Sequence, residues 1–174
     1  LKNHFTLYGG YVANTNKLAA ALARLLQEGK TGGADYMEYK RRFGWEFGGM
    51  RLHEYYFEGL TKTPAPLAAG SKLSAALAKD FGSFELWEKD FRASGAMRGI
   101  GWVSLAYDCW SKRLFNVWTN EHDAGNLPGA HPILVMDVFE HAFMLDYGLK
   151  RAEYIAAYFK AIDWKRAAER FEKN

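Results

Sequence analysis

Asp137 and His141 place a carboxylate and an imidazole four residues apart. They follow an apolar run with strand character, Pro132–Met136, at the point where helical spacing begins. Residues four apart on a helix lie on one face, so both side chains could reach one metal ion. Taken alone, however, such a pair at a helix start is more typical of a cap or a salt link.

Two distant histidines could complete a metal site. His4 lies on an otherwise apolar helical face, and His53 lies beside an aromatic stripe in a second helix. Each could instead be a hydrogen-bonded core histidine. Three buried imidazoles and a buried carboxylate without a common partner would be costly, and a shared metal would remove that cost. Three nitrogens and one carboxylate suit iron or manganese and leave a position for solvent or substrate.

The elements that must position these residues change type along the chain. Two long helices, at 1–29 and 35–60, are expected to pair as an antiparallel hairpin, with Asp35 capping the second. A linker follows at 61–71. The second part is predicted to contain, in order, helices at 73–81 and 84–95, strands at 101–107, 113–118 and 132–137, and helices at 138–147 and 152–174.

This order predicts an α+β fold, in which an N-terminal antiparallel helical hairpin precedes a lobe with a three-stranded antiparallel sheet flanked by helices. We expect two domains, a helical hairpin domain at 1–72 and an α/β domain at 73–174. Ser83, after Gly82, is expected to cap the helix at 84–95.

Composition narrows the possible functions. The 174 residues are 49% hydrophobic, and 23 basic and 20 acidic residues give a net charge of +3. Without a long basic stripe, nucleic-acid binding is not indicated, and no apolar run of about 18 residues predicts a membrane helix. The single cysteine, Cys109, favours a reducing compartment, so we expect a cytoplasmic location. Because the chain begins without an initiator Met, a removed targeting segment stays open.

Five motifs are spread over the whole chain: Tyr11-Val-Ala-Asn-Thr-Asn16, His53-Glu-Tyr-Tyr-Phe57, Phe81-Gly-Ser-Phe84, Gly99-Ile-Gly-Trp102 and Asp137-Val-Phe-Glu-His141. Together they resemble the iron/manganese superoxide dismutase family. The resemblance implies an antioxidant enzyme that disproportionates superoxide to oxygen and hydrogen peroxide. It also implies one Fe or Mn per subunit, held by His4, His53, Asp137 and His141.

The resemblance also implies two residues that orient metal-bound solvent and relay a proton, Tyr11 and His122. The family holds that solvent with a Gln or a His, and a Gln from the second helix would fall at position 49, where this chain has Gly49. The remaining source is the loop after the second strand. In that loop, some members hold the solvent with a histidine at the place of His122. A direct residue count against the members that use Gln would select Glu121 instead. His122 could also be an exposed loop histidine. The histidine, together with Val135, favours iron over manganese.

The resemblance further implies a homodimer with Glu140 and His141 at the interface, although Glu140 also suits the first turn of any helix. Trp102 could line the site or fill the core. His131 matches no family ligand and is interpreted as a loop residue.

Several positions depart from the family pattern. His4 lies seven residues before Tyr11 instead of eight, and Asn3, a poor ligand, takes the eighth position. Tyr8 and Met144 replace a His and a Tyr that pair across the subunit interface, and Phe139 replaces a Trp. These changes suggest an alternative function, a catalytically impaired member that acts as a structural or interaction module. A mononuclear non-haem iron oxygenase is a weaker rival. Such sites use two histidines and one carboxylate, whereas this chain offers a third histidine.

Overall fold

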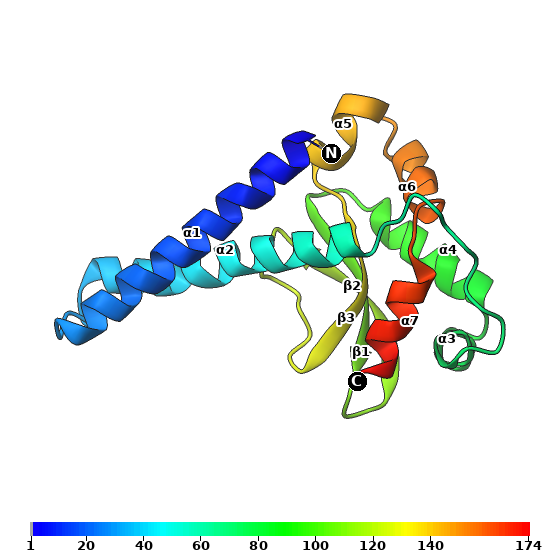
Figure 1. The fold of residues 1–174 in the computed structure, drawn as a ribbon, viewed down its shortest axis with the longest axis horizontal. Coiled ribbons are helices and arrows are strands. Elements are labelled where there is room, and N and C mark those ends of the chain that lie inside the picture. Colours follow the sequence, from blue (N-terminus) through cyan, green and yellow to red (C-terminus); the bar gives the residue numbers. More distant parts are fainter. Residues whose placement is uncertain (1) are drawn as a thin grey trace.

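The computed structural model describes residues 2–174, which form the predicted α+β fold (Figure 1). Two long helices come first, and a lobe of shorter helices around one sheet follows. The elements are α1 (Lys2–Gln27), α2 (Ala34–Glu58), α3 (Lys72–Phe81), α4 (Phe84–Gly95), β1 (Gly101–Asp108), β2 (Arg113–Asn120), β3 (Ala130–Asp137), α5 (Glu140–Tyr147), α6 (Arg151–Phe159) and α7 (Trp164–Glu172). The domain boundary at 72/73 stays a prediction.

Helices α1 and α2 form the expected antiparallel hairpin, which projects away from the lobe in Figure 1. The expected cap at Asp35 is wrong. Gly33 is the N-cap of α2 and makes no side-chain cap bond, while Asp35 lies inside the first turn. There its negative charge still interacts favourably with the positive end of the helix. The hairpin returns the start of α1 to the lobe, beside α5.

The sheet has the order β2-β1-β3, and β1 pairs antiparallel with both neighbours. Trp102 on β1 lies opposite Thr119 on one side and Asp137 on the other. The central strand therefore connects the strand that ends at Asp137 with the strand that leads into the loop of His122. His131 belongs to β3, where it is exposed, so its assignment to a loop is wrong.

The predicted C-terminal helix is in fact two helices, α6 and α7, separated by residues 160–163. Ile162 forms an isolated bridge with Leu60, and the amide of Asp163 donates to the carbonyl of Gly59 at 2.8 Å. The Asp163 side chain then caps α7 by accepting from the amide of Arg166. The break follows from these pairings with a segment about one hundred residues earlier in the chain.

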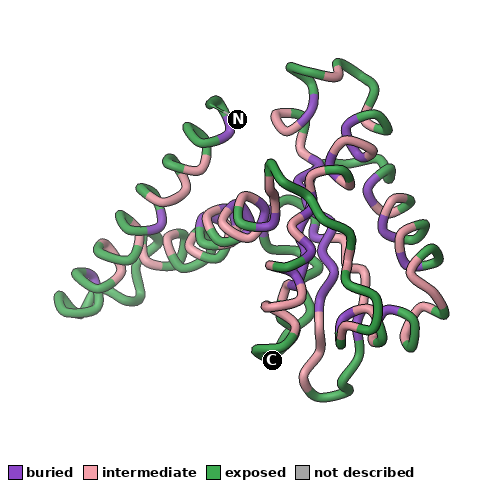
Figure 2. The backbone as a smooth tube through the Cα atoms, turned by 45° about the vertical axis from the view of Figure 1, so that its right-hand side comes forward, coloured by how far each residue is buried: buried purple, intermediate pink, exposed green. Residues whose placement is uncertain are grey.

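The core lies in the lobe, between the sheet and the helices that cover it (Figure 2). Its largest fully buried side chains include Trp87 and Phe91 of α4, Trp102 of β1 and Leu134 of β3. Ser83 caps α4 as predicted, accepting from the amide of Leu86 at 3.1 Å. The far end of the hairpin is largely exposed (Figure 2). The lobe and the near end of the hairpin hold the buried His4, His53 and Asp137.

Candidate metal centre

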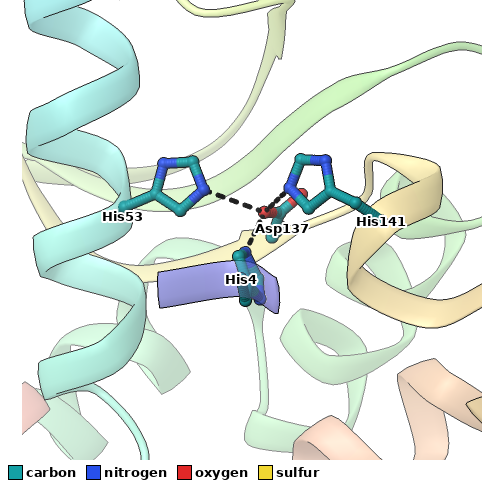
Figure 3. Close-up of side chains that lie close together, drawn as sticks. All are labelled: His4, His53, Asp137 and His141. Atoms are coloured by element: carbon teal, nitrogen blue, oxygen red, sulfur yellow. Dashed lines mark hydrogen bonds and ion pairs between the residues drawn. The ribbon is translucent and has the colours of Figure 1, made fainter. Parts of the chain in front are cut away.

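Four elements each bring one predicted donor to the junction of hairpin and lobe (Figure 3). His4 comes from α1, His53 from α2, Asp137 from the end of β3 and His141 from α5. The Nε2 atoms of His4 and His141 lie 2.8 and 3.0 Å from Asp137 Oδ2, and Nε2 of His53 lies 3.8 Å from the same oxygen. Three imidazoles therefore face a single carboxylate oxygen.

Asp137 is held so that only this oxygen faces the histidines. Its Oδ1 accepts a hydrogen bond from the amide of Phe139 at 2.8 Å, which fixes the carboxylate plane. The side chain is fully buried. Burial alone would raise the pKa of Asp137, but hydrogen bonds from His141 and His4 lower it to about 2. The group is therefore an anion throughout the physiological range.

His53 presents an unpaired nitrogen to the same point. Its Nδ1–H donates to the carbonyl of Gly49, one turn earlier in α2, at 2.6 Å. A carbonyl oxygen only accepts, so the lone pair of the ring lies on Nε2. That nitrogen is buried and has no hydrogen-bond partner among residues 2–174. Burial also lowers the pKa of His53 to about 4, which keeps its lone pair free at neutral pH.

The four donors fit a metal ion. Their ligand atoms all lie within 4.8 Å of one another, close to twice the bond length of about 2.1 Å that imidazole and carboxylate ligands make. A buried lone pair without a partner is costly, and coordination is the interaction that would satisfy it. Three imidazole nitrogens with one carboxylate suit iron or manganese.

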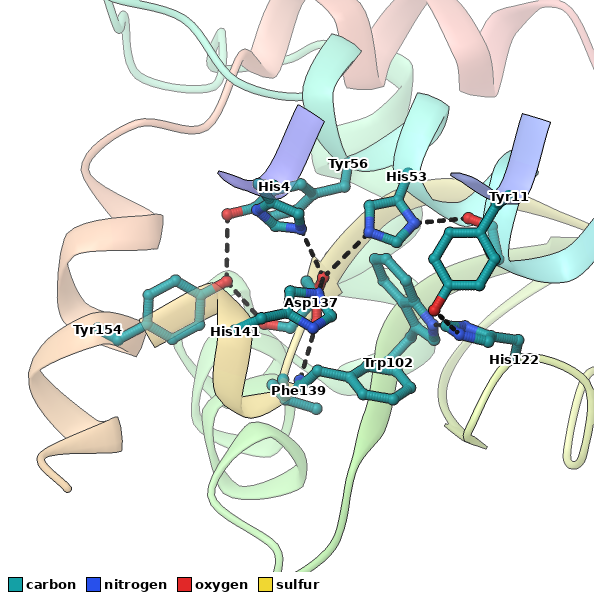
Figure 4. A network of polar contacts seen from close by, with 12 residues as sticks. His4, Tyr11, His53, Tyr56, Trp102, His122, Asp137, Phe139, His141 and Tyr154 are labelled. Carbon is teal, nitrogen blue, oxygen red and sulfur yellow. Dashed lines mark hydrogen bonds and ion pairs between the residues drawn. The ribbon is translucent and has the colours of Figure 1, made fainter. Parts of the chain in front are cut away.

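Tyr11 and His122, the two predicted proton-handling residues, lie together beside His53 (Figure 4). His122 Nε2 and Tyr11 Oη are 2.8 Å apart, and the indole Nε1 of Trp102 donates to His122 Nδ1 at 3.0 Å. An indole nitrogen only donates, so the proton of the neutral His122 ring is on Nε2 and is donated to Tyr11. The hydroxyl proton of Tyr11 is then free for another acceptor.

Burial sets the protonation of both residues. His122 is fully buried, so the alternative of an exposed loop histidine is wrong. Burial lowers the pKa of His122 to about 4. Burial raises the pKa of Tyr11 to about 12, with the nearby Asp137 charge acting in the same direction. At neutral pH the pair is therefore an imidazole and a phenol, both uncharged.

Two glycines of α2 make room for this pair. A Cβ on Gly48 would lie 2.2 Å from the carbonyl oxygen of His122, and one on Gly49 would lie 2.6 Å from the Tyr11 ring. Glu121, the other residue considered for the loop position, points elsewhere and accepts from the indole of Trp45 at 2.7 Å. Its backbone has a positive φ of 50°, which helps turn the following residue inward.

The seven-residue spacing between His4 and Tyr11 suits an unbroken helix. With about 3.6 residues per turn, seven residues make nearly two full turns, so both side chains lie on one face. α1 is α-helical throughout Lys2–Gln27. Asn3, at the eighth position, is exposed.

The departures at Tyr8 and Met144 remodel the outer part of the site. Tyr8 donates to Glu54 at 3.1 Å, and Arg51 holds the same carboxylate at 2.7 Å. Met144 is 44% exposed on α5, next to the exposed Glu140. The hydroxyl of Tyr8 therefore has a partner within its own chain.

Sequence reasoning missed the tyrosines that contact the backbone of Asp137. Tyr154 of α6 donates to the Asp137 carbonyl at 2.6 Å, and Tyr56 of α2 contacts the Tyr154 hydroxyl at 3.3 Å (Figure 4). Their spacing from the ligands follows no local period, so nothing in the sequence alone would single them out.

The adjacent glycines Gly48 and Gly49 are, in contrast, a usable sequence signal of close packing against α2. Glycine is unfavourable inside a helix unless packing requires it.

No helix among residues 2–174 combines the length and apolar character needed to cross a bilayer.

Comparisons with known proteins point to one family. Residues 69–170 match the family described as iron/manganese superoxide dismutases, C-terminal domain. The chain is 34% identical to manganese superoxide dismutase 2 of Haloferax volcanii over 171 residues, covering 98% of this chain and 84% of the relative. It is 38% identical to an iron superoxide dismutase of Cupriavidus metallidurans over 167 residues, covering 94% and 82%. An iron superoxide dismutase of Aquifex pyrophilus is 35% identical over 179 aligned positions, covering 99% and 83%.

Proposed function

The chain belongs to the iron/manganese superoxide dismutase family, and we propose that His4, His53, Asp137 and His141 are the ligands of its metal ion. As an oxidoreductase of this family, it converts two superoxide anions and two protons to oxygen and hydrogen peroxide. The alternative of an impaired structural module is not favoured, since the relatives named above are superoxide dismutases and the three buried donors converge with the half-buried His141.

The unpaired Nε2 of His53 is the observation that carries the proposed ligand set. His4 and His141 could satisfy Asp137 by hydrogen bonds alone, as in an ordinary buried polar cluster. The Nε2 of His53 is buried without such a bond among the described residues, yet it is directed at the same oxygen. A cation at the centre would satisfy all four side chains at once.

A bound iron or manganese ion would supply the alternating one-electron oxidation and reduction of superoxide. The chain would handle the protons. His122 donates to Tyr11 and holds its phenol oxygen in place, which leaves the Tyr11 hydroxyl proton available next to His53. Trp102 fixes the tautomer of His122 from the other side. We propose Tyr11 and His122 as the catalytic pair on this basis.

Iron is our proposed metal, because His122 takes the place of the glutamine with which other members hold the bound solvent, and because Val135 lies two residues before Asp137. The relatives named above include both manganese and iron enzymes, so the ligand set alone accommodates either metal. Elemental analysis of protein purified from its native host would decide between them.

We also propose a homodimer in which Glu140 reaches the ligand His141 of the partner subunit. Glu140 is exposed at the start of α5, and the side chain of His141 keeps 23% of its surface accessible in the single chain. A cytoplasmic location is proposed from the single cysteine.

The ligand proposal is tested by metal content and superoxide consumption of the wild type and two single variants. His53→Ala and Asp137→Ala should lose the metal and the activity together. His131→Ala, which changes an exposed histidine of β3, is the control and should keep both. Retention of metal by His53→Ala and Asp137→Ala would refute the ligand set.

A further inference from the structure

Strand β3 is an edge strand, so alternate backbone groups face away from β1. The amide of Val138 donates to Gly101 of β1 at 3.0 Å. Val138 therefore faces β1. Because successive residues of a strand face opposite sides, the carbonyls of Asp137 and Val135 point to the open side of the sheet. Buried carbonyls in such positions need partners from other elements.

Two tyrosines one helical turn apart on α6 supply those partners. Tyr158 donates to the carbonyl of Val135 at 2.8 Å, and Tyr154 donates to the carbonyl of Asp137 at 2.6 Å. Tyr154 is 5% exposed and Tyr158 is 3% exposed. The two bonds are chemically alike, but one is made to a proposed metal ligand and the other to an apolar residue.

Tyr56 adds a third member on the side of the ligand. Its hydroxyl lies 3.3 Å from that of Tyr154 (Figure 4). A phenol has one proton, and the proton of Tyr154 goes to a carbonyl that can only accept. Tyr56 is therefore the donor in this contact. A series of hydrogen bonds then leads from Tyr56 through Tyr154 to Asp137. Tyr56 comes from α2, the helix that also carries His53.

We propose that Tyr154 is a positioning residue for Asp137, and that Tyr56 orients it. Asp137 is then fixed at two places, by Tyr154 at its carbonyl and by the amide of Phe139 at its Oδ1. The side-chain oxygen Oδ2 is left directed at the three histidines. The same series of hydrogen bonds connects α2 and α6 to the ligand. The position of Asp137 at the metal centre therefore depends on the spacing of these two helices. This inference rests on the proposed ligand set.

The test compares Tyr154→Phe with Tyr158→Phe, a matched control that removes the same kind of buried bond two residues away on the same strand. Each variant is loaded with manganese, and the rate of metal loss to a chelator is measured beside the melting temperature of the metal-free protein. Both variants should melt about 3 °C below the wild type, because each loses one buried hydrogen bond. Tyr154→Phe alone should lose metal about tenfold faster, as expected when a group that orients a ligand is removed.

Tyr56→Phe leaves the bond to Asp137 in place and should give a smaller acceleration in the same direction. Equal rates of metal loss for Tyr154→Phe, Tyr158→Phe and the wild type would overturn the positioning role, and so would equal acceleration in both variants. If Tyr154→Phe does not fold, an unchanged rate for Tyr56→Phe overturns it. A wild type that binds no manganese or iron would instead refute the proposed metal centre itself.

Discussion

At the scale of single residues, the two hydrogen bonds of His122 determine where its proton lies. Trp102 can only donate to Nδ1, so Nε2 must carry the hydrogen that is directed at Tyr11. A side chain that replaces His122 must accept on one side and donate on the other. Alanine can do neither, and glutamine can do both.

We therefore expect His122→Ala to keep its metal but to lower kcat about tenfold to a hundredfold and to shift the metal's reduction potential. His122→Gln should restore much of kcat, because its amide oxygen can accept from Trp102 and its NH₂ can donate to Tyr11. Steady-state kinetics, metal analysis and redox titration would measure these effects. Loss of metal from His122→Ala would contradict a role outside the ligand set.

Protonation of His122 also makes the stability of the metal-free protein depend on pH. Burial lowers the pKa of His122 from 6.5 to about 4 in the folded chain. Between these values the unfolded chain binds a proton that the folded chain does not, so the unfolding free energy falls as the pH falls from 6.5 to 4. The full effect is about 3 kcal/mol at most.

Denaturant unfolding of the metal-free protein at several pH values would measure this loss. His53 contributes in the same direction, since burial lowers its pKa to about 4 as well. The loss should therefore be about halved, not abolished, in His122→Gln. A variant with the pH dependence of the wild type would show that His122 titrates normally in the folded chain.

At the scale of elements, α2 must approach both α1 and the loop after β2. Gly48 lies against the carbonyl of His122, and Gly49 lies against the ring of Tyr11. Elsewhere in the helix, Gly44 has open space around it among the described residues. The helix thus carries glycine both where close packing requires it and where it does not.

Gly48→Ala should displace the loop, because a Cβ 2.2 Å from a backbone oxygen cannot be accommodated without movement. We expect a loss of about 1–3 kcal/mol in unfolding free energy, together with reduced activity. Gly44→Ala is the matched control, and it should gain about 0.5–1 kcal/mol from helix propensity. Thermal unfolding and superoxide assays would measure both. Full activity in Gly48→Ala would mean that the loop does not depend on this contact.

The same elements show what the sequence could and could not predict. Clear local signals, such as Gly82 followed by the capping Ser83, placed helix α4 correctly. The break between α6 and α7 was missed, because it depends on pairing of Ile162 with the distant Leu60. Likewise, Glu121 and His122 are neighbours, and only the space at Gly48 and the turn at Glu121 determine which one faces inward.

At the scale of the whole molecule, exposed apolar side chains gather around the carboxyl half of α5. Met144, Leu145 and Leu149 are 44%, 73% and 89% exposed. Met144 follows Glu140 by four residues and Leu145 follows the partly accessible His141 by four, so each pair shares one face of α5. This face suits the proposed contact between two subunits.

Glu140→Ala should raise the dimer dissociation constant at least about tenfold, because each subunit would lose a charge-assisted hydrogen bond to His141 of the partner subunit. Glu153→Ala, which removes an exposed glutamate from the first turn of α6, should leave it unchanged. Sedimentation velocity over a range of protein concentrations would measure both constants. A wild type that is monomeric at all concentrations would contradict the proposed dimer.

The central claim is that four side chains from α1, α2, β3 and α5 bind one redox-active ion. Anomalous diffraction from crystals of the metal-bearing protein, at the absorption edge of iron or manganese, tests it most directly. We predict a single peak per chain, bounded by Nε2 of the three histidines and Oδ2 of Asp137. A peak at another place, or a chain that consumes superoxide with no peak among these four atoms, would contradict it.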